Sequence, residues 1–170
     1  MGASSSCRIF EKVSDSLKYA LTDFFKVSHV VKLLDDFLFI GKSLEDCTYG
    51  RDSFRKLCTL TGFPIAERKT VDPCHALTFL GVHLDTSEGI ASIPREKIIK
   101  YSRDIRSLLQ VKETSFKNLK SIIGKLQFVA SIIPAGRCFL RSLHDLTIGH
   151  YSRHSLVKLP LEVCKDLEIW

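Results

Sequence analysis

VVKLLDDFLFIG, residues 30–41, is the stretch around which the rest of the sequence is organised. Two short apolar runs flank a pair of adjacent acids, Asp35 and Asp36. Apolar runs of this kind on either side of a polar dipeptide are typical of a β-hairpin. We therefore expect two strands joined by a two-residue turn at Asp35-Asp36, at the tip of a buried hairpin that ends at Gly41.

The acid pair favours a metal site. Two adjacent carboxylates repel each other, and a divalent cation bound between them would neutralise this repulsion. A second interpretation stays open, because the Asp side chain often bonds nearby backbone amides in turns. An Asp-Asp turn can therefore also be a solvated corner.

Composition indicates an ordinary globular protein. The chain has 170 residues, of which 45% are hydrophobic and 26% charged, with a formal net charge of +6. Its six cysteines are scattered without a C-x-x-C spacing, and no signal peptide precedes them, which predicts an intracellular protein, cytoplasmic or nuclear and not secreted. No stretch approaches the roughly 18 apolar residues of a membrane span, so no membrane partner is expected.

The first half of the sequence is predicted to alternate helices with hairpins. Apolar residues recur at helical spacing over residues 7–25 and again up to Gly62, where a capping box at Ser43 begins the second helix. Residues 63–69 are expected to form a loop with a brief strand. Strands over 76–84 and 90–93 are expected to pair as a second hairpin.

The second half is predicted to be helical. Pro94 suits a first helical position, and Thr114 or Ser115 is expected to cap the following helix, in which Gly124 would allow a neighbour to approach closely. We expect a shorter helix over 137–146, an irregular tail over 147–159 and a last helix from Leu161. The fold class is therefore α+β, a helix, hairpin, helix, hairpin region followed by a small helical lobe.

Basic residues are concentrated after Pro94. Between Arg95 and Lys125 there are nine Lys or Arg residues against three acids. Such a surplus suits a polyanion, although a solvated helix face rich in Lys and Arg would have the same composition.

Several short motifs in one order resemble a reverse transcriptase, the RNA-directed DNA polymerase of retroelements, of the DIRS and Ngaro type that integrate with a tyrosine recombinase. GASSSCRIF, residues 2–10, resembles motif B, and Leu34-Asp35-Asp36 resembles motif C. Residues 62–69 resemble motif D with Lys69 as its lysine, and Phe79-Leu80-Gly81 resembles motif E. SIIGKLQF, residues 121–128, and PAGR, residues 134–137, are similar to the thumb helices of these elements.

The resemblance implies a division of the chain into three parts. Residues 1–93 would be a partial polymerase palm with motifs B to E, residues 94–146 a helical thumb-like region, and residues 147–170 a tail leading toward a ribonuclease H part. It also implies an RNA or DNA template–primer as partner.

The resemblance further implies two-metal nucleotidyl transfer and a role for each matching residue. Asp35 and Asp36 would bind Mg²⁺ or Mn²⁺, and Lys69 would supply charge or a proton to the leaving pyrophosphate. The remaining residues would contact the nucleic acid or the nucleotide. Template and nucleotide support would come from Gly2, Ser4, Ser5 and Phe10, the primer grip from Phe79, Leu80 and Gly81, and backbone contacts from Lys97, Lys100, Arg103, Lys117 and Lys120.

The sequence departs from the family where motif A would lie. In the family a further metal-binding aspartate lies upstream of motif B, and this sequence begins at motif B. We therefore expect weak metal binding and a fragment that is inactive alone, unless an upstream segment supplies the missing strand. The alternatives are a non-catalytic nucleic-acid-binding remnant, a domesticated retroelement-derived protein, or an inert fragment.

Overall fold

A computed structural model of the chain describes residues 5–149, 152 and 155–170. The fold is α+β, as predicted, and it consists of two compact units, residues 1–80 and residues 81–170. The predicted boundary between palm and thumb, at residue 93, is a division by function and stays a prediction. No helix in the described part of the chain is both long enough and apolar enough to cross a membrane.

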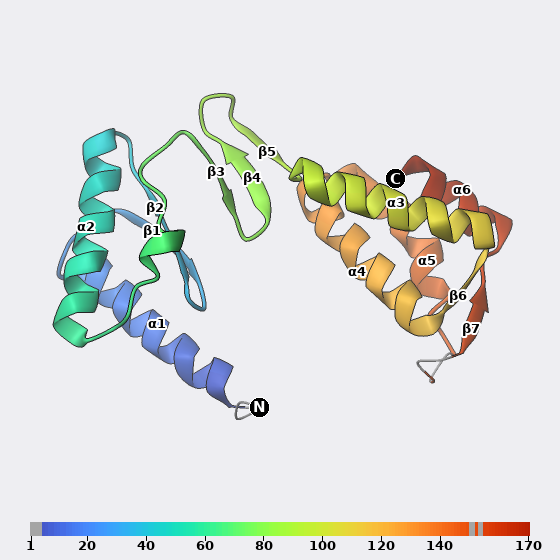
Figure 1. Cartoon of the computed structure of the whole chain (residues 1–170), viewed down its shortest axis with the longest axis horizontal. Coiled ribbons are helices and arrows are strands. Elements are labelled where there is room, and N and C mark those ends of the chain that lie inside the picture. The colour runs from blue at the N-terminus through green and yellow to red at the C-terminus, as the bar shows by residue number, and fades with distance from the viewer. Residues whose placement is uncertain (1–4, 150–151, 153–154) are drawn as a thin grey trace. The chain divides into compact units, whose positions relative to one another are not determined.

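The first unit consists of helices packed on a hairpin (Figure 1). Helix α1 contacts strand β1, helix α2 contacts strand β2, and the two helices contact each other. The bounds are α1 Ser6–Asp23, β1 His29–Leu33, β2 Asp36–Ile40, α2 Leu44–Thr61, the 3₁₀ turn η1 Glu67–Lys69 and β3 Ala76–Phe79.

The core of the first unit is formed by apolar residues of α1, the hairpin and α2. Its buried members are Leu17, Leu21, Val27, Val30 and Leu57, and phenylalanines of β2 and α2 pack against them. Burial of these side chains is the main favourable contribution to folding of this unit.

The predicted start of α2 at Ser43 and its predicted end at Gly62 are both confirmed. The Ser43 side chain accepts a hydrogen bond from the Asp46 backbone N–H at 3.2 Å, which satisfies one of the free amides of the first turn. Gly62 ends the helix in the left-handed conformation, with φ +71°, where a residue without Cβ is least strained.

The second unit is a helical lobe with two short pairs of antiparallel strands (Figure 1). Strand β4 pairs with β5, and β6 pairs with β7, both antiparallel. The bounds are β4 Val82–Asp85, β5 Ile90–Ser92, α3 Arg95–Val111, β6 Glu113–Ser115, α4 Phe116–Ile132, the 3₁₀ helix η2 Pro134–Leu140, α5 Arg141–Asp145, β7 Leu156–Lys158 and α6 Leu161–Ile169.

Helix α4 is the centre of this lobe. Its apolar stripe is buried at Leu119, Ile122, Ile123, Leu126 and Ala130, in one core with residues of α3, α5, β7 and α6. Ser115 is its N-cap and accepts from the Asn118 backbone N–H at 3.3 Å. Pro94 lies at the N-cap of α3 and not at the first helical position.

Further local predictions are wrong. Residues 63–69 contain no strand but a 3₁₀ turn, and the strand expected over 76–84 is interrupted between Phe79 and Val82. The tail over 147–159 is not wholly irregular, since β7 pairs with β6. A Cβ built on Gly124 would have no atom within 4 Å, so that glycine admits no close neighbour, whereas one on Gly136 would collide with the Trp170 ring.

Candidate active site

The turn of the β1–β2 hairpin lies one residue earlier than predicted. Leu33 pairs with Asp36, so Leu34 and Asp35 form the turn and Asp36 is the first residue of β2. Leu34 has φ +50°, a left-handed backbone conformation that is costly for a residue with a Cβ. The expected buried tip is also wrong, because Asp35 and Asp36 are both exposed.

Helix α1 stabilises this strained turn through a hydrogen bond. Ser14 is fully buried, and its hydroxyl donates a hydrogen bond to the Leu34 carbonyl at 2.5 Å. A neutral hydrogen bond of this kind contributes about 1 kcal/mol, and its buried members cost more if left without partners. Ser14 therefore holds the residue that precedes Asp35.

A second contact ties β1 to α1. The Lys32 ammonium lies 2.6 Å from Glu11 Oε1 and 2.7 Å from Asp15 Oδ1, and only 6% of the Lys32 side chain is exposed. Hydrogen bonds to Asp15 and then to Glu11 raise the pKa of Lys32 above its usual value. The hairpin is thus held to α1 close to its acidic tip.

The other strand packs on α2 through aromatic rings. The ring centroids of Phe37 and Phe39 lie 4.6 Å and 5.7 Å from that of Phe54. Since side chains alternate along a strand, Asp36 and Leu38 lie on the opposite face from Phe37 and Phe39. Packing of the phenylalanines against α2 therefore turns the Asp36 carboxylate away from the core.

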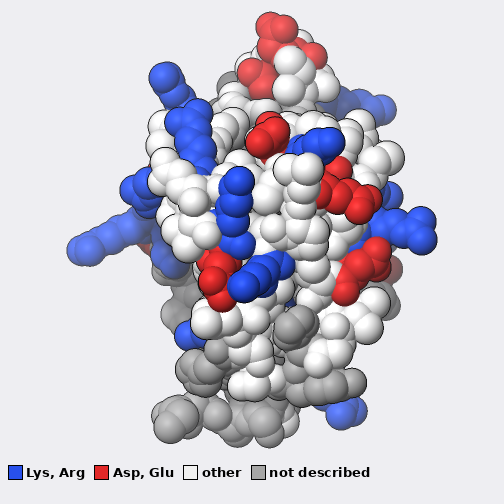
Figure 2. Space-filling model, turned by 90° about the vertical axis from the view of Figure 1, so that its right-hand side faces the viewer, with Lys and Arg blue, Asp and Glu red and all other residues white. Residues whose placement is uncertain are grey.

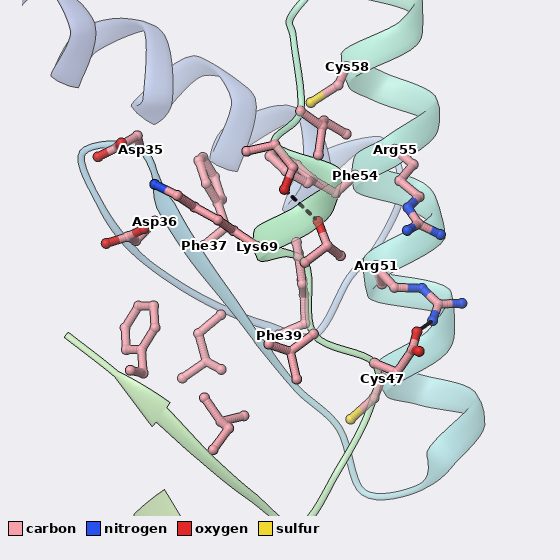
Figure 3. A pocket seen from close by; sticks show the side chains of 18 of the residues that line it. Asp35, Asp36, Phe37, Phe39, Cys47, Arg51, Phe54, Arg55, Cys58 and Lys69 are labelled. Carbon is pink, nitrogen blue, oxygen red and sulfur yellow. Dashed lines mark hydrogen bonds and ion pairs between the residues drawn. The ribbon is translucent and has the colours of Figure 1, made fainter. Parts of the chain in front are cut away.

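A cavity of about 450 Å³ lies beside the hairpin within the first unit. Asp35, Asp36 and Lys69 all line it, and in Figure 3 the Lys69 side chain points toward the two acids. Among the residues described, no ion pair joins Lys69 to either carboxylate. Two carboxylates and one ammonium therefore share an open cavity in which each can still bind a ligand.

The other predicted site residues of the first unit differ in whether they line this cavity. Phe10, Phe79 and Leu80 line the same cavity as the acids. Ser5 is exposed at the N-cap of α1 and makes no side-chain cap. Gly2 and Ser4 lie outside the described residues. The roles assigned to all of these residues stay predictions.

The residues of the second unit that are predicted to bind the nucleic-acid backbone differ in solvent exposure. Lys100, Arg103, Lys117 and Lys120 are exposed. Lys97 is half-buried, where its ammonium donates to the Gly81 carbonyl at 3.1 Å and lies 4.5 Å from the Phe128 ring centroid. Figure 2 shows that Lys and Arg on the face it draws are interspersed with acids and uncharged residues.

The acid pair is the metal-binding candidate of the first unit. Carboxylate oxygens are the ligands that Mg²⁺ prefers, but Mg²⁺ demands nearly octahedral geometry. Within the described ranges, no group of three or more His, Cys, Asp or Glu side chains is placed to hold a metal ion. Two adjacent carboxylates fit a divalent cation chemically and would leave most of its coordination sphere to water or a ligand.

Sequence reasoning missed three residues that shape this site. Ser14 gave no signal, since a serine in a helix is usually solvated or bonded within its own helix. Arg51 and Arg55 lie one turn apart in α2, and they form ion pairs with Asp72 at 2.6 Å and Glu67 at 2.8 Å. Their spacing is visible in the sequence, but their partners in an irregular segment are not.

Comparison with known proteins shows what this arrangement resembles. No family model matches the sequence, and no curated protein matches it. A solved structure, the foamy viral protease-reverse transcriptase in complex with double-stranded DNA, superposes with a TM-score of 0.68 at 18% sequence identity. The match covers 96% of this chain and 26% of that one, so the chain spans about a quarter of the viral protein's length. The chain therefore has the fold of a region of a reverse transcriptase.

Proposed function

We propose that this chain is a segment of a reverse transcriptase, of DIRS or Ngaro type, that carries carboxylates for RNA-directed DNA synthesis. The observation that supports this most is the acid pair, exposed on an anchored hairpin beside Lys69, in a fold similar to that of a viral reverse transcriptase. In this proposal, Asp35 is the principal metal ligand, and Asp36 is a weaker or indirect one.

The residues of the cavity have distinct roles in this proposal. When bound, two Mg²⁺ or Mn²⁺ ions would stabilise the attacking primer 3′-oxygen and the leaving pyrophosphate. Asp35 and Asp36 would hold the cation at the hairpin tip, and Ser14 and Lys32 tie that hairpin to α1. Lys69 lies beside them and neutralises, or protonates, the departing pyrophosphate.

The hairpin offers a place for a further strand. In the described part of the chain its sheet has two strands, so each outer edge carries unpaired backbone groups. Beside Asp36, its outward face carries three exposed apolar side chains, Val31, Leu33 and Ile40, which are 44%, 49% and 48% exposed. We propose that another segment or chain pairs here and supplies the third carboxylate that catalysis needs.

The partner in this proposal is a template–primer duplex. The viral neighbour was solved with double-stranded DNA, and the exposed basic side chains of α3 and α4 suit phosphate contacts. Such contacts give affinity without reading sequence. Electrostatic contacts would thus hold the duplex, and its primer 3′ end would lie beside the acid pair.

Manganese binding tests the site itself. Mn²⁺ titration followed by electron paramagnetic resonance should show weak binding that Asp35→Asn lowers at least about fivefold. Asp23→Asn, which removes an exposed carboxylate at the end of α1, is the matched control and should bind as wild type. Equal Mn²⁺ affinity in Asp35→Asn and wild type would overturn the proposal.

Primer extension separates the proposal from a non-catalytic nucleic-acid-binding remnant, which the exposed basic residues would also allow. The chain alone should give no more product than Asp35→Asn. Addition of a segment with an acid-bearing strand should give extension that depends on Asp35. A folded chain that binds duplex but shows no Asp35-dependent metal binding or extension under either condition would be such a remnant.

A further inference from the structure

The segment that carries Lys69 has little structure of its own. Residues 63–74, which we call the Lys69 strap, connect α2 to β3 and contain only the 3₁₀ turn η1. At its start, Phe63 packs on Phe10 with ring centroids 5.9 Å apart and donates its backbone N–H to the Cys58 carbonyl. From residue 64 to residue 74, all of them described, the backbone hydrogen bonds stay within the strap.

Two arginines of α2 hold the strap on either side of Lys69. Arg55 Nη2 lies 2.8 Å from Glu67 Oε2, and Arg51 Nη1 lies 2.6 Å from Asp72 Oδ1. Arg51 and Arg55 are four residues apart and therefore lie on one face of the helix. Figure 3 shows both arginine side chains on α2, with Lys69 on the other side of the strap, near the acids.

Few apolar contacts reinforce these ion pairs. Val71 is 62% exposed, and Ile65 is only half-buried. The acids of the strap are exposed too, by 62% for Glu67 and 88% for Asp72, so each pair is a weak, partly solvated contact. Because no backbone hydrogen bond joins residues 64–74 to another element of the described chain, these two ion pairs are the polar contacts that tie the strap to α2 on either side of Lys69.

We infer that Arg51 and Arg55 are positioning residues that act through the strap to keep the Lys69 ammonium facing Asp35 and Asp36. The ligand that this arrangement suits is a polyphosphate with a divalent cation, such as pyrophosphate, because an ammonium and a cation would contact the same anion. The choice of ligand rests on the proposed function, but the positioning of Lys69 does not.

The position of Lys69 can be measured without any activity. A water-soluble carbodiimide activates a carboxylate, and the neutral amine of a nearby lysine then displaces the urea to form an amide. Mass spectrometry gives the yield of the Lys69–Asp35 and Lys69–Asp36 crosslinks. Arg51→Gln with Arg55→Gln should lower that yield at least about twofold. Arg55→Glu with Glu67→Arg should restore it relative to Arg55→Glu alone. Lys56→Gln, which removes one exposed charge from α2 without breaking an ion pair, is the matched control.

Pyrophosphate binding in the presence of Mg²⁺, measured by calorimetry, provides the second readout. Lys69→Gln should weaken it, and each arginine variant should weaken it about two- to fivefold, the range of one exposed ion pair. The thermal unfolding midpoint of each variant confirms that it is folded.

The outcomes separate the two claims. Crosslink yields that do not change in the arginine variants, or a wild-type protein without these crosslinks, would overturn the positioning role. Crosslinks that respond as expected, with no pyrophosphate binding in any variant, would leave the positioning role intact and contradict the proposed function of Lys69.

Discussion

The backbone of Leu34 determines where Asp35 lies. Its φ of +50° belongs to the left-handed region, which a leucine adopts only when surrounding contacts compensate. The hydrogen bond from the buried Ser14 hydroxyl to the Leu34 carbonyl is such a contact. The geometry of the acid pair therefore depends on a residue twenty positions away in the sequence.

Ser14→Ala is expected to destabilise the chain. The substitution leaves the Leu34 carbonyl without its donor, which costs about 1–2 kcal/mol of unfolding free energy, measurable by urea denaturation. Ser16→Ala is the control, because the Ser16 hydroxyl is exposed and bonds only to Lys12 of its own helix. Equal stabilities of the two variants would show that the Ser14 bond does not support the turn.

At this scale the sequence singles out the two acids, whose role as metal ligands stays a prediction, but it does not predict the structure around them. Asp35 and Asp36 were identified because two carboxylates flanked by apolar strands are chemically unusual. The turn was placed one residue late because Leu34 is apolar and continues the strand pattern, whereas in the structure it takes a turn position. Its left-handed conformation is imposed by a contact with α1, which is a tertiary effect.

The contact between α1 and β1 at Lys32 predicts a pH dependence. The pKa of Lys32 is raised by Asp15 and Glu11, so its ion pairs stabilise the fold fully below the unfolded value, near 10.5, and this contribution is lost as pH rises through the folded value. Lys32→Met should therefore be less stable than wild type at pH 7, with the difference shrinking above pH about 10.5. Urea denaturation of both proteins across that range measures it. A difference that stays constant to high pH would show that the ion pairs do not cause it.

Substitution by alanine should have opposite effects at Gly124 in α4 and at Gly136 in η2. Gly124→Ala should stabilise the chain by up to about 1 kcal/mol, because alanine is the better helix former and the new methyl group meets nothing within 4 Å. Gly136→Ala, of identical chemistry, should be destabilising, because its methyl group would meet the Trp170 ring. Thermal unfolding of the two variants gives the comparison. Destabilisation by Gly124→Ala would mean that α4 has a neighbour at this position after all.

Helices were predictable at the element scale, and short strands were less so. Helices α1, α2 and α4 have 17 or 18 residues each, long enough for a periodic pattern to show, and the Ser43 and Ser115 caps mark the starts of α2 and α4. Strands β6 and β7 have three residues each and pair across about forty positions, so no local pattern reveals them. For residues 63–69 the pattern predicts a loop with a brief strand, and the strand is wrong, because the strap is held by two ion pairs to α2 that no local pattern reveals.

For the whole molecule, the proposal requires duplex binding by charge. Lys100→Gln or Arg103→Gln should each reduce the slope of log affinity against log salt by about 1 if the side chain contacts a phosphate. Lys125→Gln is the control, since Lys125 is ion-paired with Asp104 at 2.8 Å. Fluorescence anisotropy with a labelled template–primer at several salt concentrations measures the slopes. Slopes that are alike in wild type and both variants would place the duplex elsewhere.

The order of short motifs along the chain predicts the reverse-transcriptase-like fold, which the similarity to the viral structure supports. The assignment of each motif to its residues stays a prediction. Each of the two units has its own core, and every residue of the candidate cavity comes from the first unit. The acid pair, Lys69 and the cavity therefore lie within the first unit, while the exposed basic residues belong to the second.

The central claim is that the acid pair holds a divalent metal at the end of a bound primer. Fe²⁺ can replace Mg²⁺ and, with ascorbate and oxygen, generates hydroxyl radicals that cut nucleic acid close to the bound ion. With a labelled template–primer, cleavage should concentrate at the primer 3′ end, weaken strongly in Asp35→Asn and persist in Asp23→Asn. Cleavage spread evenly along the duplex, or unchanged in Asp35→Asn, would contradict the account.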